Sequence, residues 1–328
     1  MAKKINPDDV KKVLVISLSN LGDIILTFPV IDILRRDFAQ ADLSVMIGPR
    51  GKSLLIDNPK VDHLYIYDKH MGLRNKIRWI AQLRKEKFDL IVDLRHGILP
   101  LILRTKYRTP LIRRRILDEH YRDQHLRYLY AVHPAHLSNE RYAFYPLEKD
   151  VDSVKSILRE HFQPEDPIAV MAPGAADHRK RWTEDGFAKV ADQLAQQKGL
   201  HIVFVGSEND SPIISRIMAR MQRSALDLSG KISFPQTGII MRLAKIVIAN
   251  DSSAMHLASY LGVPLIALYG PTNPVKSGPW GNWSGFIQHN EDCMACCEKI
   301  PDAEHSCMNA IQPAEVIAMA ERLMNPSF

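Results

Sequence analysis

The chain has few cysteines and no long apolar run. All four cysteines lie between Cys293 and Cys307. A secreted disulfide framework would spread its cysteines along the chain, so we expect a reducing, cytoplasmic environment. No run of about eighteen apolar residues occurs, which argues against a membrane-spanning helix. The segment Met1–Lys12 has no apolar stretch, and we therefore expect no signal peptide.

Two nucleotide-binding signatures are also missing. The chain contains neither GxGxxG nor GxxxxGKS/T, which argues against a dinucleotide-dependent oxidoreductase and against a P-loop NTPase.

The cysteines form an incomplete zinc pattern. Cys293 and Cys296 make one CxxC pair, followed by Cys297 and Cys307, with His289 and His305 nearby. Structural zinc sites usually have a second closely spaced pair, which this segment lacks. We expect reduced structural thiols and no metal, while a zinc site remains the alternative.

What is present is the composition of a globular protein. Of the 328 residues, 46% are hydrophobic and 24% are charged. A chain of this length suggests two domains with ample core. The formal net charge is +6, which suggests an acidic partner: a phosphorylated substrate, an anionic membrane surface or a nucleic acid.

Apolar strands alternate with helical segments twice along the chain, which predicts an α/β protein with two doubly wound domains. In the first half, strands are expected at Val13–Leu18, Leu43–Ile47, His63–Tyr67 and Phe88–Asp93. In the second half, strands are expected at Ile168–Ala172, His201–Val205, Ile246–Ala249 and Leu265–Tyr269. The expected divisions are an N-terminal domain 1–150, a linker 151–167, a C-terminal domain 168–311 and a closing helix 312–328. A cleft between two such halves is a natural substrate site.

Lys245–Pro274 is the most informative stretch. It reads as a buried strand, a polar turn Asn250–Ser253, a short helix stopped by Gly262, and a second buried strand. The turn would lie at the carboxyl end of a strand and the amino end of a helix, where an anion such as phosphate binds well. The alternative is that Asp251 or Ser252 only caps the helix.

Two further loops follow strands of the second half. Pro173–Ala175 would let backbone approach a ligand, and Lys180 nearby suits a diphosphate. The alternative is a solvated basic loop. Gly206–Glu208 after the next strand would meet a ribose or a base, although the signal is weak by itself.

Gly22 and Asp23 end the first strand of the N-terminal half. Asp23 would be either a general base at a strand's carboxyl end or a simple helix N-cap. Asp150–Asp152 superficially resembles a metal-binding acid pair, but it opens a polar helix and we expect it to cap that helix.

Five short motifs lie in order along nearly the whole chain: Ser19–Asp23, Pro173–Ala175, Lys180–Trp182, Asn250–Ala258 and Tyr269–Pro274. In this order they resemble the ADP-heptose:lipopolysaccharide heptosyltransferases, glycosyltransferase family 9. The segment His305–Pro313 looks like the tail of heptosyltransferase II-like members. One departure is Ser253, where the family usually has Gly, which affects how closely backbone approaches the pyrophosphate.

This resemblance implies a GT-B fold, in which two Rossmann-like domains face each other across a cleft. The C-terminal domain would bind the nucleotide-sugar and the N-terminal domain the lipid acceptor. Asp23 would take the proton from an acceptor hydroxyl, which attacks the anomeric carbon with inversion and expels ADP. Lys180 and the N–H groups at 251–254 would stabilise the charge that grows on the diphosphate. No metal or other cofactor would be needed.

The expected donor-binding residues are Gly174, Ala175, Lys180, Gly206, Ser207, Glu208, Asp251, Ser252, Ser253, Ala254 and His256. The expected acceptor-binding residues are Ser19, Asn20, Gly22, Arg104, Lys106 and Arg113. The segment Arg104–Arg127 holds eight Lys or Arg against three Asp or Glu, and would meet the phosphorylated inner core at the cytoplasmic membrane face. The alternative is a solvated basic face. We expect a monomer in peripheral contact with the inner membrane.

Other classes of protein remain open. A related transferase would use a different sugar or acceptor, and an epimerase would convert the free nucleotide-sugar without an acceptor. The positive charge alone also suggests a nucleic-acid-binding protein, but no RNA- or DNA-reading motif is visible.

Overall fold

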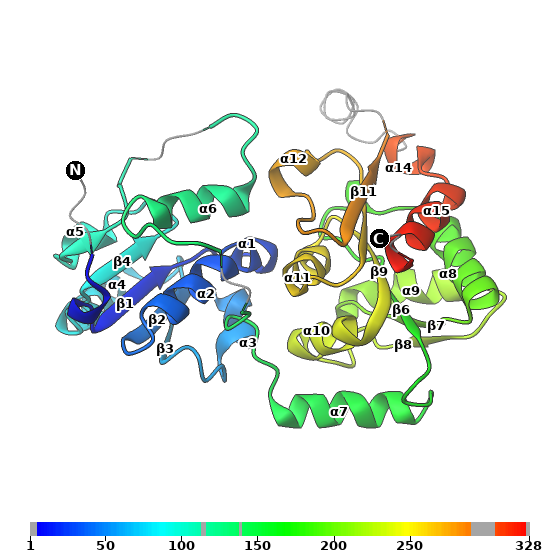
Figure 1. Ribbon diagram of the computed structural model, residues 1–328, viewed down its shortest axis with the longest axis horizontal. Helices are drawn as coiled ribbons and strands as arrows, with labels where there is room; N and C mark the ends of the chain where they lie inside the picture. The colour runs from blue at the N-terminus through cyan, green and yellow to red at the C-terminus, as the bar shows by residue number, and fades with distance from the viewer. Residues whose placement is uncertain (1–4, 113–115, 138–139, 290–305, 326–328) are drawn as a thin grey trace. The chain divides into compact units, whose positions relative to one another are not determined.

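The computed structural model describes residues 5–112, 116–137, 140–289 and 306–325. The chain divides into two compact units, Met1–Leu147 and Glu148–Phe328. Each unit has a parallel sheet of its own. Figure 1 shows the elements of both units with their labels.

The sheet of unit 1 has five parallel strands in the order β3-β2-β1-β4-β5. The strands are β1 Lys12–Ile16, β2 Asp42–Ile47, β3 His63–Ile66, β4 Leu90–Asp93 and β5 Tyr107–Arg108. The α-helices are α1 Leu21–Leu26, α2 Phe28–Asp37, α3 Lys52–Leu55, α4 Leu73–Lys85, α5 Leu99–Ile102 and α6 Tyr121–Tyr130. Two short 3-10 helices are η1 Pro7–Asp9 and η2 Pro49–Gly51.

Successive side chains of β1 point to opposite faces of this sheet. Leu14 and Ile16 pack with Leu83 of α4 and with Leu103, which follows α5, so α4 and α5 cover one face. Val13 and Val15 on the other face are fully buried too. Pro29 lies in the first turn of α2, where the missing N–H of proline costs no helical hydrogen bond.

The sheet of unit 2 has six parallel strands in the order β11-β10-β9-β6-β7-β8. The strands are β6 Ile168–Ala172, β7 His201–Phe204, β8 Ala225–Asp227, β9 Ala244–Asn250, β10 Leu265–Tyr269 and β11 Ser284–Gln288. The α-helices are α7 Glu148–Arg159, α8 Glu184–Lys198, α9 Ser211–Met218, α10 Phe234–Leu243, α11 Ser253–Leu261, α12 Pro274–Ser277, α14 Ser306–Ala310 and α15 Pro313–Met324. Two short 3-10 helices are η3 His178–Lys180 and η4 Glu208–Asp210.

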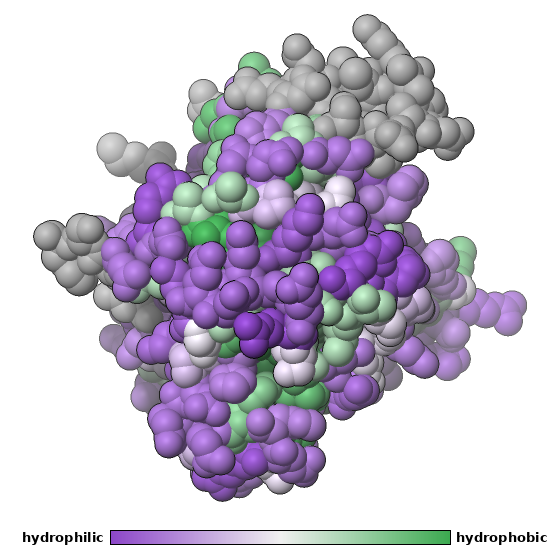
Figure 2. All heavy atoms as spheres, turned by 90° about the vertical axis from the view of Figure 1, so that its right-hand side faces the viewer, coloured by the Kyte–Doolittle hydropathy of each residue, from purple (hydrophilic) through white to green (hydrophobic). Residues whose placement is uncertain are grey.

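Helices α8, α9 and α15 bury their apolar sides on one face of the unit 2 sheet. Phe187 of α8, Ile214 of α9 and Val316 of α15 belong to one core cluster with the strands β6, β7, β9 and β10. The outer side of this layer is mostly hydrophilic, with small and separate hydrophobic areas (Figure 2). The expectation of an α/β protein with doubly wound parallel sheets is therefore confirmed.

Residues typical of helix ends mark the limits of two helices in unit 2. The Thr183 side chain accepts a hydrogen bond from Gly186 N–H at the start of α8, and Gly262 ends α11 with a positive φ of 71°. One boundary prediction is wrong. Asp150 and Asp152 do not cap α7, because the helix already begins at Glu148 and includes both residues.

Candidate functional site

The strand order places two polar loops of unit 2 side by side. Strands β6 and β9 are neighbours, and the chain leaves them toward opposite sides of the sheet. Open parallel sheets bind ligands outside the carboxyl ends of the strands at such a switch point. The loop beginning at Pro173 follows β6, and Asp251 follows β9. These loops carry most of the predicted donor-binding residues.

Asn250 ties the two loops together. Its side chain is fully buried, and its Nδ2 donates a hydrogen bond of 2.7 Å to the Pro173 carbonyl. Its Oδ1 accepts a hydrogen bond of 3.1 Å from the backbone N–H of Trp182. Trp182 is itself held in the core and donates from Nε1 to the Ile311 carbonyl. The Lys180 segment is therefore fixed against the end of β9.

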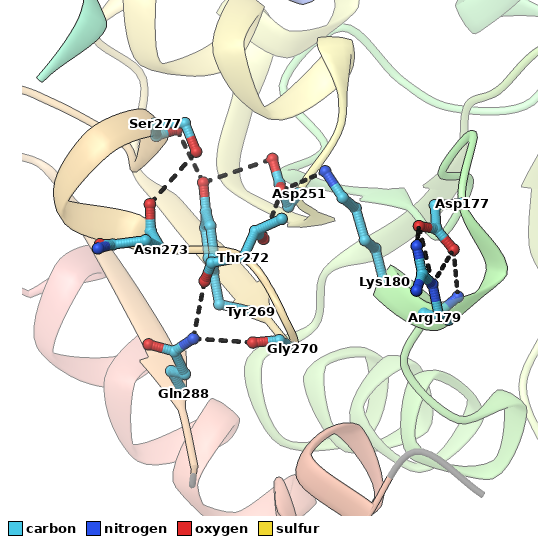
Figure 3. A network of polar contacts seen from close by, with 10 residues as sticks. All are labelled: Asp177, Arg179, Lys180, Asp251, Tyr269, Gly270, Thr272, Asn273, Ser277 and Gln288. Atoms are coloured by element: carbon cyan, nitrogen blue, oxygen red, sulfur yellow. Dashed lines mark hydrogen bonds and ion pairs between the residues drawn. The ribbon is translucent and has the colours of Figure 1, made fainter. Parts of the chain in front are cut away.

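Asp251 gathers three side chains around one buried carboxylate (Figure 3). Lys180 Nζ lies 2.7 Å from Asp251 Oδ2, and Thr272 Oγ1 donates to the same oxygen at 2.7 Å. The Tyr269 hydroxyl lies 3.5 Å from Oδ1 and donates a shorter hydrogen bond of 2.8 Å to the Ser277 carbonyl. Burial, and then the Asp251 charge, raise the pKa of Tyr269 well above its ordinary value, so this phenol stays protonated. Asp251 thus anchors Lys180.

Helix α11 begins directly after this cluster. Ser252 is its N-cap residue by backbone conformation, but its side chain makes no capping hydrogen bond, and its Oγ is buried without a partner. Asp251 uses its carboxylate elsewhere, so the capping interpretation of this turn does not hold. Ser253 and Ala254 lie in the first turn, whose N–H groups have no intrahelical acceptor. His256 is buried in the second turn, with its ring 6.2 Å from that of Trp280.

Gly174 and the Gly206–Glu208 turn meet at Asp210. A Cβ on Gly174 would lie 2.6 Å from Asp210 Oδ2, so a side chain at this position would displace the carboxylate. Asp210 Oδ2 accepts hydrogen bonds from the backbone N–H and the hydroxyl of Ser207 at 2.8 and 2.7 Å. The structure therefore brings Gly174, Gly206 and Ser207 together, while Glu208 is exposed.

The basic loop after β6 has its own anchors. Arg181 donates from Nε and from a terminal nitrogen to the Ala175 carbonyl at 3.0 and 2.7 Å. Asp177 holds Arg179 with a contact of 2.7 Å, and the Arg179 guanidinium lowers the pKa of Asp177 to about 2. These contacts leave Lys180 pointing to Asp251, as Figure 3 shows.

The Gly270–Pro274 loop is fixed from the next strand. Gln288 at the end of β11 donates from Nε2 to the carbonyls of Gly270 and Thr272 at 2.8 and 2.9 Å (Figure 3). This support holds the Thr272 hydroxyl where it reaches Asp251.

In unit 1, Asp23 lies in the first turn of α1, at the carboxyl end of β1. The N-cap position belongs to Asn20, so the N-cap interpretation of Asp23 does not hold. Asn20 Nδ2 donates a hydrogen bond of 3.0 Å to Asp23 Oδ2, and Asp23 is half-buried. Ser19 and Gly22 are half-buried in the same turn. The four residues expected here are therefore together.

The predicted acceptor-binding cations are not with them. Lys106 immediately precedes β5, and Tyr107 is in register with Leu90 at the start of β4. Because all strands of this sheet are parallel, Lys106 lies at its amino-end edge, whereas Asp23 follows the carboxyl end of β1. Arg104 lies in the loop just before Lys106, and Figure 1 draws α1 and α5 at opposite ends of the sheet. Arg113 lies outside the described residues.

The same carboxyl-end edge holds residues that the sequence did not single out. Asp93 ends β4 beside β1, is buried, and accepts backbone hydrogen bonds from Arg95 and Gly97, both at 2.8 Å. Burial raises the pKa of this carboxyl. The Arg95 guanidinium is exposed and lies 5.3 Å from the centre of the Tyr67 ring. In the sequence, the signal that could have identified Asp93 is its position at the end of an apolar run.

Three of the four cysteines, Cys293, Cys296 and Cys297, lie outside the described residues, as does His305. Cys307 is buried in the unit 2 core. His289 Nε2 lies 2.9 Å from a Glu315 oxygen. No group of three or more His, Cys, Asp or Glu arranged for a metal occurs within the residues that the structure describes.

Comparison with known proteins decides the family. The model of glycosyltransferase family 9 (heptosyltransferase) matches residues 103–306, more than half of the chain. This chain belongs to glycosyltransferase family 9.

Two relatives align with this chain over nearly their whole length. Lipopolysaccharide heptosyltransferase 3 of Escherichia coli is 27% identical over 332 residues, which cover 92% of this chain and 95% of the relative. Lipooligosaccharide heptosyltransferase 2 of Campylobacter jejuni is 27% identical over 323 residues, which cover 94% and 96%. The protein is therefore a transferase enzyme.

Solved structures agree on the fold. A glycosyl transferase family 9 protein from Veillonella parvula superposes with a TM-score of 0.79 at 24% identity, covering 97% of this chain and 98% of its own. The ADP-heptose lipopolysaccharide heptosyltransferase II of Escherichia coli superposes with a TM-score of 0.75 at 23% identity, covering 95% and 98%. The family 9 protein thus has the GT-B fold class.

Proposed function

We propose that this family 9 enzyme transfers a heptose from ADP-heptose to the inner core of lipopolysaccharide, with inversion at the anomeric carbon. Membership of the family supports heptosyl transfer. The relatives' names point to lipopolysaccharide or lipooligosaccharide as the acceptor, and the name of one similar structure points to ADP-heptose as the donor.

The observation that carries the proposal is the ammonium group of Lys180, held 2.7 Å from the buried Asp251 next to the first turn of α11. When the glycosidic bond to ADP breaks, negative charge grows on the diphosphate. A fixed cation and the free N–H groups of Ser253 and Ala254 stabilise that charge without rearrangement. Gly174 supports the arrangement, because its missing side chain leaves room for Asp210.

Asp23 acts as the general base in this proposal. An acceptor hydroxyl gives its proton to the carboxylate while its oxygen attacks the anomeric carbon from the side opposite ADP. Asn20 orients one carboxylate oxygen through its 3.0 Å hydrogen bond, which leaves the other oxygen for the proton. Ser19 and Gly22 line the same turn and contact the acceptor.

The acceptor's phosphates meet a different cation from those expected at first. Arg95 follows β4 at the carboxyl-end edge of the unit 1 sheet, the edge that also carries Asp23. Its planar guanidinium pairs well with phosphate oxygens. The enzyme works as a monomer at the cytoplasmic face of the inner membrane in this proposal, with no metal or other cofactor, because Lys180 supplies the positive charge.

The deciding experiment follows ADP release from ADP-heptose, with and without heptose-deficient lipopolysaccharide cores, and measures the mass of the core. Release that depends on the core, together with a gain of one heptose, is the expected result. Core-dependent release from another nucleotide-sugar would instead support a related transferase. Conversion of the donor without any core would support an epimerase and contradict the proposal.

A further inference from the structure

Helices α4 and α5 of unit 1 have an outer surface that is both apolar and basic. We propose that this surface, formed by α4 and by Ile98–Ile102, docks on a bilayer that contains anionic phospholipids. The choice of a bilayer among acidic partners rests on the proposed function, whose acceptor is a lipid.

Aliphatic side chains stand out into solvent on both helices. In α4, Leu73 is 74% exposed and Ile77, one turn later, is 59% exposed. Ile98, immediately before α5, is 69% exposed, and Leu101 and Ile102 of α5 are also exposed. Single exposed aliphatic residues are common, but four on two helices that cover one sheet face, with Ile98 directly before the second helix, indicate an interaction surface.

The polar residues beside them are basic. Helix α4 contains five Lys or Arg and no Asp or Glu: Arg74, Lys76, Arg78, Arg84 and Lys85. Among the residues that the structure describes, none of the five forms an ion pair with a carboxylate. Only Leu83 of α4 is buried. An amphipathic helix with a basic polar face and exposed aliphatic residues is typical of elements that lie in a membrane interface.

The position of the surface fits a lipid acceptor. Helix α4 connects β3 to β4 and runs back along the parallel sheet, so Leu73 and Ile77 belong to its half nearest the carboxyl-end edge. Ile98 lies near this edge, because the neighbouring Gly97 N–H donates to Asp93 at the end of β4, and from there α5 leads toward the end of the sheet opposite α1. Asp23 lies at the carboxyl-end edge, as do Leu73 and Ile77. A surface there would hold the enzyme on the bilayer while the acceptor sugar reaches Asp23.

Charge argues against a second copy of the chain as the occupant, because two such surfaces would bring ten cations together. Nucleic acid would use the cations but not the five exposed aliphatic side chains. An anionic bilayer uses both kinds of group. In the described parts of the chain, no helix has the length and apolar character needed to cross a bilayer, so the contact would be peripheral.

The test is flotation of the full chain with vesicles of phosphatidylcholine, with or without phosphatidylglycerol. We expect binding that requires phosphatidylglycerol and weakens as salt rises. Leu73→Ser with Ile77→Ser, and separately Arg74→Gln with Arg78→Gln, should each lower vesicle partitioning about tenfold. Arg242→Gln with Leu243→Ser, a matched pair of exposed residues in unit 2, should leave it unchanged. Thermal midpoints confirm that each variant is folded.

Two outcomes would overturn the inference: no binding to anionic vesicles, or binding that is equal for wild type and the α4 variants. If the same variants instead changed self-association in sedimentation, or abolished binding to an RNA oligonucleotide without affecting vesicles, the surface would serve another partner. Transfer to a deacylated, water-soluble core should be normal in the α4 variants. If no variant and no wild type transfers heptose but vesicle binding persists, the proposed function fails and the docking surface stands.

Discussion

Asp251 positions Lys180 and Thr272 in the candidate site. Its side chain is only 5% exposed and it accepts from Lys180 and Thr272. A buried carboxylate without such partners would be costly, so the three groups depend on one another. The sequence analysis places Asp251 among the donor-binding residues, and the structure adds that its carboxylate positions Lys180.

Replacing Lys180 should therefore have two effects. Lys180→Ala should lose about 2–4 kcal/mol of transition-state stabilisation in kcat/KM, the scale of one electrostatic contact in an active site. It should also lower the free energy of unfolding by about 1–3 kcal/mol, because Asp251 stays buried with fewer partners. Single-turnover kinetics and denaturant unfolding measure the two effects.

The double variant Lys180→Ala with Asp251→Asn is the control for Lys180. It removes the stranded charge, so much of the lost stability should return while the kinetic defect remains. Normal turnover in folded Lys180→Ala would reject the catalytic role.

Asp23 offers a cleaner test, because its side chain does not cap α1. Asp23→Asn keeps the size of the side chain and a hydrogen-bonding group for Asn20 but removes the base. Turnover should fall by about 10²–10⁴-fold, and the thermal midpoint should change little. The measurements are single-turnover heptose transfer and the midpoint of thermal unfolding. Near-normal transfer would exclude the base role, and a large drop in the midpoint would assign Asp23 a structural role.

At the scale of elements, the turn between β6 and η3 has room for the Asp210 carboxylate only because residue 174 is a glycine. Gly174→Ala should destabilise unit 2 by about 1–3 kcal/mol, the usual cost of overpacking, because the new methyl group overlaps the Asp210 carboxylate. Affinity for ADP should fall as well. Calorimetry on the variant checks both quantities.

Gly72→Ala is the matched control for this glycine, since no atom lies within 4 Å of the added methyl group. Equal stability of the two variants would show that contact with Asp210 does not restrict residue 174.

The strands that carry strong local signals were predictable from the sequence. The buried runs that became β1, β6, β9 and β10 are long and apolar, and Thr183 and Gly262 mark helix ends by their own chemistry. Strands β5, β8 and β11 were missed. The first two have only two and three residues and lie at or next to a sheet edge, so neither length nor periodicity identifies them.

The grouping of residues in the candidate site was predictable only where those residues lie close together in the sequence. Asn20 and Asp23 are three residues apart, and their grouping follows from one turn. Lys180 and Asp251 are 71 residues apart, and only the neighbouring positions of β6 and β9 bring them into contact. The position of Lys106 at the amino-end edge, away from Asp23, was not predictable for the same reason, because the order and ends of strands do not follow from a local pattern.

At the scale of the whole molecule, the proposed chemistry needs no metal. Activity should survive exhaustive treatment with a chelator, with the thermal midpoint unchanged, because the charge on the leaving diphosphate is met by Lys180 and the start of α11. Metal analysis of the purified enzyme accompanies the activity assay. Stoichiometric zinc whose removal unfolds the protein would show that Cys293, Cys296, Cys297 and Cys307 form a metal site.

The pairing of β6 with β9 also bears on how the protein acquires its activity as it folds. Asn250 and Pro173, which join the two loops, are 77 residues apart in the chain. Their hydrogen bond can form only after β9 has paired with β6. Contacts between distant segments form late, because the entropy of closing a long loop opposes them. During refolding, helical signal should return before the ability to bind ADP, and a chain released before β9 is complete would have a compact fold but no nucleotide site.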